Sequence, residues 1–131
     1  MPIPMPILSR LQAVQIHVDG VVFCVGRPLD QGLPAAIAPT AWGIAPGILK
    51  DSPEEQRSGH ADLQQRLRQA GIQFVPARFV LPGKQVDGCI LLAASRDRAI
   101  RLAYKLGEWA VFHIVESGVR VVYSGFNSRS R

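Results

Sequence analysis

The sequence predicts one α+β domain, a mostly antiparallel sheet with two helices in the order β-β-β-α-β-β-α-β-β. The chain has 131 residues, a length typical of a single domain. Hairpin turns are expected near both ends, at Asp19-Gly20 and Ser117-Gly118. Two amphipathic segments with helix-capping residues lie between these turns, and few βαβ units can form, which favours antiparallel pairing. We expect residues 1–126 to form this domain.

Residues 14–25 carry the strongest hairpin signal in the chain. Asp19-Gly20 is a dipeptide preferred in type I′ turns, and β-branched residues flank it on both sides. A two-residue loop at this point pairs Ile16 with Phe23. Because side chains alternate along a strand, this pairing places one set of residues from both strands on a common face.

Residues 35–71 form the stretch around which the rest of the chain is organised. Residues 35–42 are expected to be a short strand that ends at Trp42. Pro39 cannot donate a hydrogen bond to a neighbouring strand, which places this strand at an edge of the sheet or at a strand end. Glycine and proline then make residues 43–51 a loop.

The helix that follows has the clearest start signal. In Ser52-Pro53-Glu54-Glu55, Ser is the expected N-cap, Pro stands at the first helical position and Glu stands three residues after the cap. Gly71 is placed to end the helix in a left-handed conformation. One face of this helix is expected to carry Gln56, His60, Leu63, Leu67 and Ala70.

Two strands are expected after this helix. Residues 72–81 are extended in character, but Pro76 interrupts them, which predicts an edge strand or a bent strand. Residues 86–94 are apolar on both faces from Cys89 onward, as in a central strand that is covered on both sides.

A second helix and a second hairpin complete the predicted fold. Ser95 can cap a helix over residues 96–106, and Gly107 can end it. Residues 110–115 and 119–123 then alternate in polarity as a hairpin would.

Composition restricts the classes of protein that fit. With 47% hydrophobic and 19% charged residues, the chain is typical of soluble globular proteins, and a net charge of +5 permits an acidic partner. No apolar run is long enough to cross a membrane, and residues 1–8 lack the basic start of a signal peptide, so a cytoplasmic location is expected. Two cysteines, Cys24 and Cys89, are too few for a disulfide framework or a zinc site. We expect an extended arm over residues 1–10 and a flexible basic tail over residues 127–131.

Four pieces of the chain resemble a family of small bacterial proteins catalogued as domain of unknown function 3293. The pieces, spread over residues 36–112, are Thr40-Ala41-Trp42-Gly43, Ser52 with Glu54-Glu55-Gln56, Asp87-Gly88-Cys89, and Gly107-Glu108 before Ala110-Val111. The family's polar residues are replaced here at Gly43, Gln56, Asp87, Cys89 and Glu108. The resemblance implies the fold and a bacterial source, and it supplies no activity.

The first functional hypothesis is a non-enzymatic binding module for a protein partner or a small ligand. Trp42 can line a pocket with Thr40 and Glu55 at the strand–helix junction, where apolar walls and a few polar groups converge. The simpler alternative makes Trp42 a core anchor and Glu55 part of a helix cap. The full candidate set is Thr40, Trp42, Glu55, Gln56, Asp87 and Glu108.

The second hypothesis is binding of nucleic acid or another polyanion. Arg98, Arg101 and Lys105, with Arg96, form a basic stripe on the outward face of the second helix and can contact phosphates. A solvated helix face explains the same stripe. No aromatic residues are interleaved to stack on bases.

The third hypothesis is a small enzyme that uses Glu55, Asp87 or Glu108 in acid–base chemistry. It requires these carboxylates to converge in one cleft and at least one of them to have a shifted pKa. The histidines show no HxH or HxxxH spacing, so no metal is expected, and no cofactor motif is present. Edge strands at Pro39 and Pro76 permit a homodimer.

Overall fold

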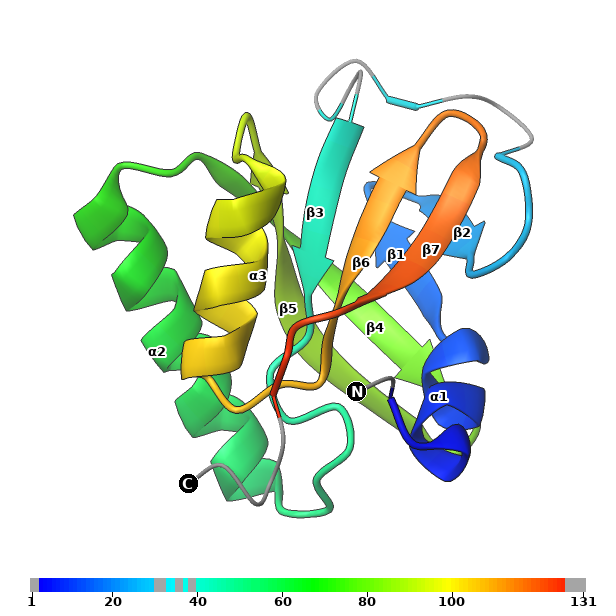
Figure 1. The fold of residues 1–131 in the computed structure, drawn as a ribbon, viewed down its shortest axis with the longest axis horizontal. Coiled ribbons are helices and arrows are strands. Elements are labelled where there is room, and N and C mark those ends of the chain that lie inside the picture. The colour runs from blue at the N-terminus through cyan, green and yellow to red at the C-terminus, as the bar shows by residue number, and fades with distance from the viewer. Residues whose placement is uncertain (1–2, 30–32, 35–36, 38–39, 127–131) are drawn as a thin grey trace.

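The computed structural model describes residues 3–29, 33–34, 37 and 40–126, and these residues form the expected single α+β domain. Three helices accompany seven strands (Figure 1). The elements are α1 (Met5–Gln12), β1 (Gln15–Val18), β2 (Val21–Cys24), β3 (Thr40–Ile44), α2 (Pro53–Ala70), β4 (Phe74–Leu81), β5 (Lys84–Leu92), α3 (Arg96–Lys105), β6 (Ala110–Val115) and β7 (Gly118–Tyr123).

The strands form one antiparallel sheet in the order β2-β1-β4-β5-β3-β6-β7. The sheet curls until its two outer strands approach each other. Val25 and Val119 form an isolated bridge there, and the Gly26 N–H donates to the Val119 carbonyl at 3.0 Å. Such curling brings the strands around a common interior, and it leaves the outer face of the sheet for helices to cover.

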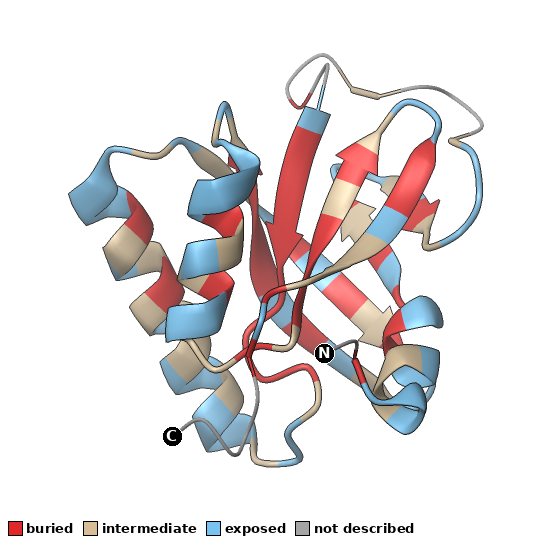
Figure 2. Ribbon diagram, in the orientation of Figure 1, coloured by how far each residue is buried: buried red, intermediate tan, exposed pale blue. Residues whose placement is uncertain are grey.

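Two apolar cores result from this arrangement. The larger core fills the inside of the curl, where α1 contributes Leu11 and the rings of Phe79 and Phe112 pack 5.5 Å apart. The second core lies between the sheet and the helices α2 and α3, which run side by side on the outer face (Figure 1). Leu63 of α2 and Ala103 of α3 are fully buried there, and Figure 2 shows buried residues along the strands between the two layers.

The first hairpin forms as predicted. Asp19 and Gly20 both have positive φ, 50° and 76°, as a type I′ turn requires. Ile16 pairs with Phe23, and both side chains are buried. The second hairpin, β6–β7, is also confirmed.

Both predicted helices are confirmed with their caps. The Ser52 hydroxyl accepts a hydrogen bond from the Glu55 N–H at 3.2 Å, and Gly71 ends α2 in the left-handed region. The Ser95 hydroxyl accepts from the Arg98 N–H at 3.2 Å in α3. These contacts satisfy N–H groups that have no partner inside the helix.

The prediction of an extended arm over residues 1–10 is wrong, because Met5–Gln12 form the helix α1. The prolines that suggested extended chain stand at the N-cap and in the first turn, Pro4 and Pro6, where a helix needs no N–H donors. Leu11 anchors α1 in the larger core. The tail over residues 127–131 lies outside the described residues.

The predicted strand over residues 35–42 is misplaced, because the structure has β3 at Thr40–Ile44. Trp42 stands in the middle of β3 and not at its end, because the strand continues through Gly43 and Ile44, which were expected in a loop. Gly43 lets the Phe79 ring pack closely against the strand, since a Cβ on Gly43 would lie 3.1 Å from that ring. The strand runs between β5 and β6, so it is not an edge strand. Pro39 lies outside the described residues.

The strand β4 is also interior, between β1 and β5, although Pro76 predicted an edge or a bend. The β1 pairing covers β4 only from Arg78 to Val80. Pro76 therefore lies beyond the end of β1, where a residue without an N–H leaves no ladder bond unmade on that side.

Candidate functional site

The connection between β3 and α2 folds back against the first turns of α2. Two glycines make this close approach possible. Gly47 has a φ of 75°, and a Cβ on it would lie 3.0 Å from the Gln56 backbone. A Cβ on Gly59 would lie 2.9 Å from the Pro46 side chain. The loop is held from the helix side as well, because Gln56 Nε2 donates to the Lys50 carbonyl at 2.7 Å.

Glu108 is fixed at the point where α3 turns into β6. Its backbone N–H donates to the Ala103 carbonyl at 2.9 Å, and its backbone carbonyl accepts from the Ser124 hydroxyl at 2.5 Å. Its side chain reaches across to the loop, where Oε2 accepts from the Gly47 N–H at 3.0 Å. With 8% of its surface exposed, Glu108 is the carboxylic acid among the buried residues of the described chain.

Burial controls the proton affinity of this carboxyl group. It raises the pKa of Glu108 to about 7 from an ordinary value of 4.5, against the opposing effects of the Gly47 hydrogen bond and the positive charge of Lys50. Desolvation disfavours the charged form of a carboxyl group, and one hydrogen bond restores only part of the lost hydration. Glu108 can therefore exchange a proton near neutral pH.

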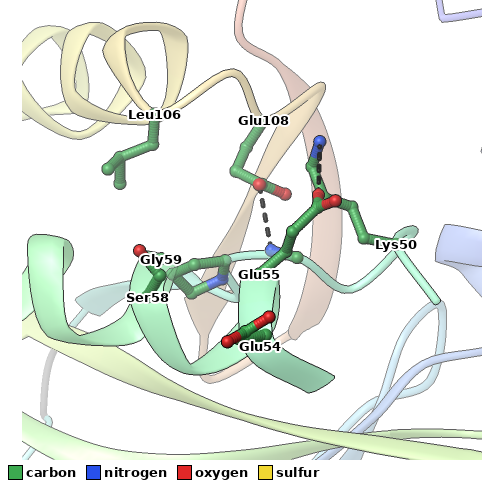
Figure 3. A pocket seen from close by; sticks show the side chains of 9 residues that line it. Lys50, Glu54, Glu55, Ser58, Gly59, Leu106 and Glu108 are labelled. Carbon is green, nitrogen blue, oxygen red and sulfur yellow. Dashed lines mark hydrogen bonds and ion pairs between the residues drawn. The ribbon is translucent and has the colours of Figure 1, made fainter. Parts of the chain in front are cut away.

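A cavity of about 360 Å³ opens next to this carboxyl group. Figure 3 shows Glu108 and Leu106 on one side and the first turns of α2 on the other. The polar side chains that line it are Lys50, Glu54, Glu55, Ser58 and Glu108. Lys50 Nζ lies 3.3 Å from Glu55 Oε2 at the rim, where both side chains are more than half exposed. We call this space the Glu108 cavity.

A second cavity, also of about 360 Å³, adjoins the same carboxyl group. It shares Lys50, Leu106 and Glu108 with the Glu108 cavity and adds the aromatic residues Trp109 and Phe126. Glu108 thus borders both cavities, and the aromatic side chains of Trp109 and Phe126 line only the second.

The predicted residues Thr40 and Trp42 lie elsewhere. Trp42 is 5% exposed and stacks on His113, with ring centroids 4.0 Å apart and planes 10° from parallel. Thr40 Oγ1 lies 3.0 Å from His113 Nε2. Burial lowers the pKa of His113, and the positive charges of Arg120 and Arg96 lower it further. Trp42 therefore acts as a packing anchor on the sheet, and it does not line the Glu108 cavity.

Gln56 and Asp87 line a different, smaller cavity of about 210 Å³ between α2 and β5, together with His60. Of the three carboxylates in the enzyme hypothesis, Glu55 and Glu108 share a cavity and Asp87 does not. The third hypothesis therefore has two of its three carboxylates in one place.

The basic stripe lies on the exposed side of α3. Arg98, Arg101 and Lys105 line a groove between α2 and α3, and Arg96 is not among its lining residues. Arg66 of α2 joins them.

Three of the polar side chains that line the Glu108 cavity were not predicted as site residues: Lys50, Glu54 and Ser58. Glu54 and Ser58 are four residues apart on a helix, so the capping signal at the start of α2 already places them on one face. Lys50 had no comparable signal, because it stands in an irregular loop whose path depends on contacts with α2.

Metal binding, nucleophilic chemistry by Cys89 and membrane spanning have little support among the described residues. No group of three metal-ligating side chains occurs among the described residues. Cys89 is buried, and burial raises the pKa of its thiol to about 12, which makes it a poor nucleophile. Among the described helices, none has the length and apolar character needed to cross a membrane.

No protein-family model, curated protein or solved structure matches this chain. The resemblance to domain of unknown function 3293 accordingly stays a prediction.

Proposed function

We propose that this protein binds a small polar ligand that carries a protonated amine, in the Glu108 cavity. The observation that carries the proposal is a buried carboxyl group, Glu108, that borders a cavity of about 360 Å³ open to solvent. That volume falls in the lower part of the range of small-molecule sites. The proposed site lies where the β3–α2 loop meets α2, and of the residues in the first hypothesis it contains Glu55 and Glu108 but neither Thr40 nor Trp42.

The charges around the cavity favour a cation. Three carboxyl groups line it, those of Glu54, Glu55 and Glu108, against the single cation Lys50. Lys50 and Glu55 form an ion pair, which leaves Glu54 and Glu108 to interact with a ligand. A buried carboxylate is unfavourable without an opposite charge nearby, and a bound ammonium group supplies that charge. Binding therefore releases the proton of Glu108.

Calorimetric titration with 1,4-diaminobutane at pH 6 and pH 8 tests the proposal. The amine is protonated at both pH values, whereas Glu108 ionises between them, so we expect affinity to rise about tenfold. Glu108→Gln should bind more weakly and show no such pH dependence. Glu116→Gln is the matched control, because Glu116 is an exposed carboxylate at the β6–β7 turn, outside the lining of the cavity. Equal binding by Glu108→Gln and the parent protein would refute the proposal.

Acid–base catalysis by Glu108 is the second candidate, and the pKa near 7 favours it. Glu54 and Glu55 stand only at the exposed rim of the cavity, so the geometry supports binding first. Chemical conversion of a bound amine, detected by mass spectrometry and lost in Glu108→Gln, would favour the enzyme.

We infer a cytoplasmic location from the chemistry of the two thiols. Cys24 and Cys89 are both unpaired, which suits a reducing compartment. Fractionation of the native host with a tagged chain would test this location.

A further inference from the structure

The groove between α2 and α3 collects four cationic side chains from two helices. Arg98, Arg101 and Lys105 come from α3, and Arg66 comes from α2 on the opposite wall. The space between them measures about 390 Å³. Sequence spacing predicts a stripe on one helix, whereas the tertiary structure adds the opposing Arg66 and makes the stripe one wall of a groove. We call this feature the cationic groove.

The three cations of α3 are available to a ligand. All three are exposed, and none of them forms an ion pair with a residue that the structure describes. Arg66 forms an ion pair with Asp62 of the same helix, whose Oδ1 lies 2.9 Å from Arg66 Nε. Unpaired cations that converge on one space repel each other, and an anion between them relieves that repulsion.

The arrangement along α3 fits a chain of phosphates. Arg98, Arg101 and Lys105 stand at i, i+3 and i+7, which spans about 10 Å at the rise of an α-helix. A single strand of nucleic acid carries one phosphate for each nucleotide, so a row of this length lets each of the three cations contact a phosphate of its own. Arg66 on the facing wall can contact a fourth, because its guanidinium presents several donors to phosphate oxygens.

The remaining residues of the groove favour contacts to a backbone over contacts to bases or lipid. The large apolar residues among its lining are Ile72 and Leu102, which are half-buried and are not exposed for insertion into a bilayer. No aromatic side chain lines the groove, so stacking on bases is not available there. Binding through the backbone alone is independent of sequence.

We propose that the cationic groove binds the phosphodiester backbone of single-stranded nucleic acid without sequence specificity. This inference is independent of the Glu108 cavity, because the two sites have no lining residue in common. Compared with the second hypothesis, the proposed site includes Arg66 and excludes Arg96.

Fluorescence anisotropy with labelled oligothymidylate of about 12 nucleotides tests the proposal, a length within the range of known single-strand sites. Affinity is measured at several salt concentrations. Four phosphate contacts predict a slope of log K against log salt of about −3 for a single strand. The double variant Arg98→Ala/Arg101→Ala removes two contacts and should reduce the slope to about −1.5. Both side chains are exposed, so the variant is expected to fold, which thermal unfolding checks.

The matched control is Arg10→Ala/Arg27→Ala, which removes the same charge from exposed positions outside the groove. Its slope should equal that of the parent protein. An unchanged slope in Arg98→Ala/Arg101→Ala, or a Kd weaker than about 1 mM at low salt, would overturn the proposal. Anionic phospholipid vesicles and inorganic phosphate are tested in parallel. Binding of either one in place of the oligonucleotide, with loss in Arg98→Ala/Arg101→Ala, would overturn the assignment to nucleic acid.

Discussion

Replacing Glu108 with Gln removes the ability of the buried side chain to ionise and leaves its size nearly unchanged. The amide stays neutral at every pH, and its oxygen can still accept the hydrogen bond that Glu108 Oε2 accepts from the Gly47 N–H at 3.0 Å. The variant therefore isolates the free energy of ionising a carboxyl group in this position.

The expected magnitude follows from the pKa of Glu108. Burial raises it to about 7 in the folded protein, against an ordinary value of 4.5 that we assign to the unfolded chain. Below the lower value, the carboxyl group is protonated in both states and has no effect on the pH dependence. Between the two values, the folded state holds a proton that the unfolded state has lost, so the free energy of unfolding falls as pH rises. At about 1.4 kcal/mol for each pKa unit, the loss between pH 4.5 and pH 7 is about 3 kcal/mol.

Urea unfolding of the parent protein and Glu108→Gln from pH 5 to pH 8 measures this loss. All other titrating groups are common to both proteins, so the difference between the two curves reports Glu108. We expect the free energy of unfolding of Glu108→Gln, relative to that of the parent protein, to rise by about 3 kcal/mol between pH 5 and pH 8. This change corresponds to roughly 10 °C in Tm. Glu55→Gln is the control, because Glu55 forms an exposed ion pair and should change stability by no more than about 1 kcal/mol. Parallel curves for the parent protein and Glu108→Gln would refute the reasoning.

Three other predictions concern the scaffold. In Gly88→Ala, the added methyl group meets the Ile44 carbonyl oxygen in the adjacent strand, which cannot rotate away. We therefore expect the free energy of unfolding, measured with urea, to fall by about 3 kcal/mol. A decrease below about 1 kcal/mol would contradict the close packing. Ser52→Ala removes the cap of α2 and should cost about 1 kcal/mol by the same assay, whereas an unchanged midpoint would show that the cap is dispensable. The imidazole of His113 should titrate below 6.5 in an NMR experiment, because burial and two arginines lower its pKa. Its neutral form then stabilises the fold above that pH, and this contribution is lost as pH falls below about 6.5; a midpoint at or above 6.5 would contradict this.

The sequence alone determined the elements that depend on local chemistry. The cap at Ser52, the C-terminal Gly71 and the turn at Asp19-Gly20 appear in the structure where they were predicted. Each depends on hydrogen bonds and backbone angles within a few residues, which the local sequence specifies. The helix α1 was missed although its signal is also local, because prolines in a first turn resemble prolines in extended chain.

Tertiary structure decided the places of the strands and the composition of both sites. Neither the interior position of β3 nor the role of Gly43 can be derived from residues near it, since both depend on strands from distant parts of the chain. Gly47 and Glu108 are 61 positions apart in sequence and meet only because the α3–β6 turn crosses the β3–α2 loop. The burial of Glu108 and the position of Arg66 opposite the cations of α3 both result from packing between elements. Such contacts arise from the whole fold, because desolvation and charge density depend on every element that surrounds a group.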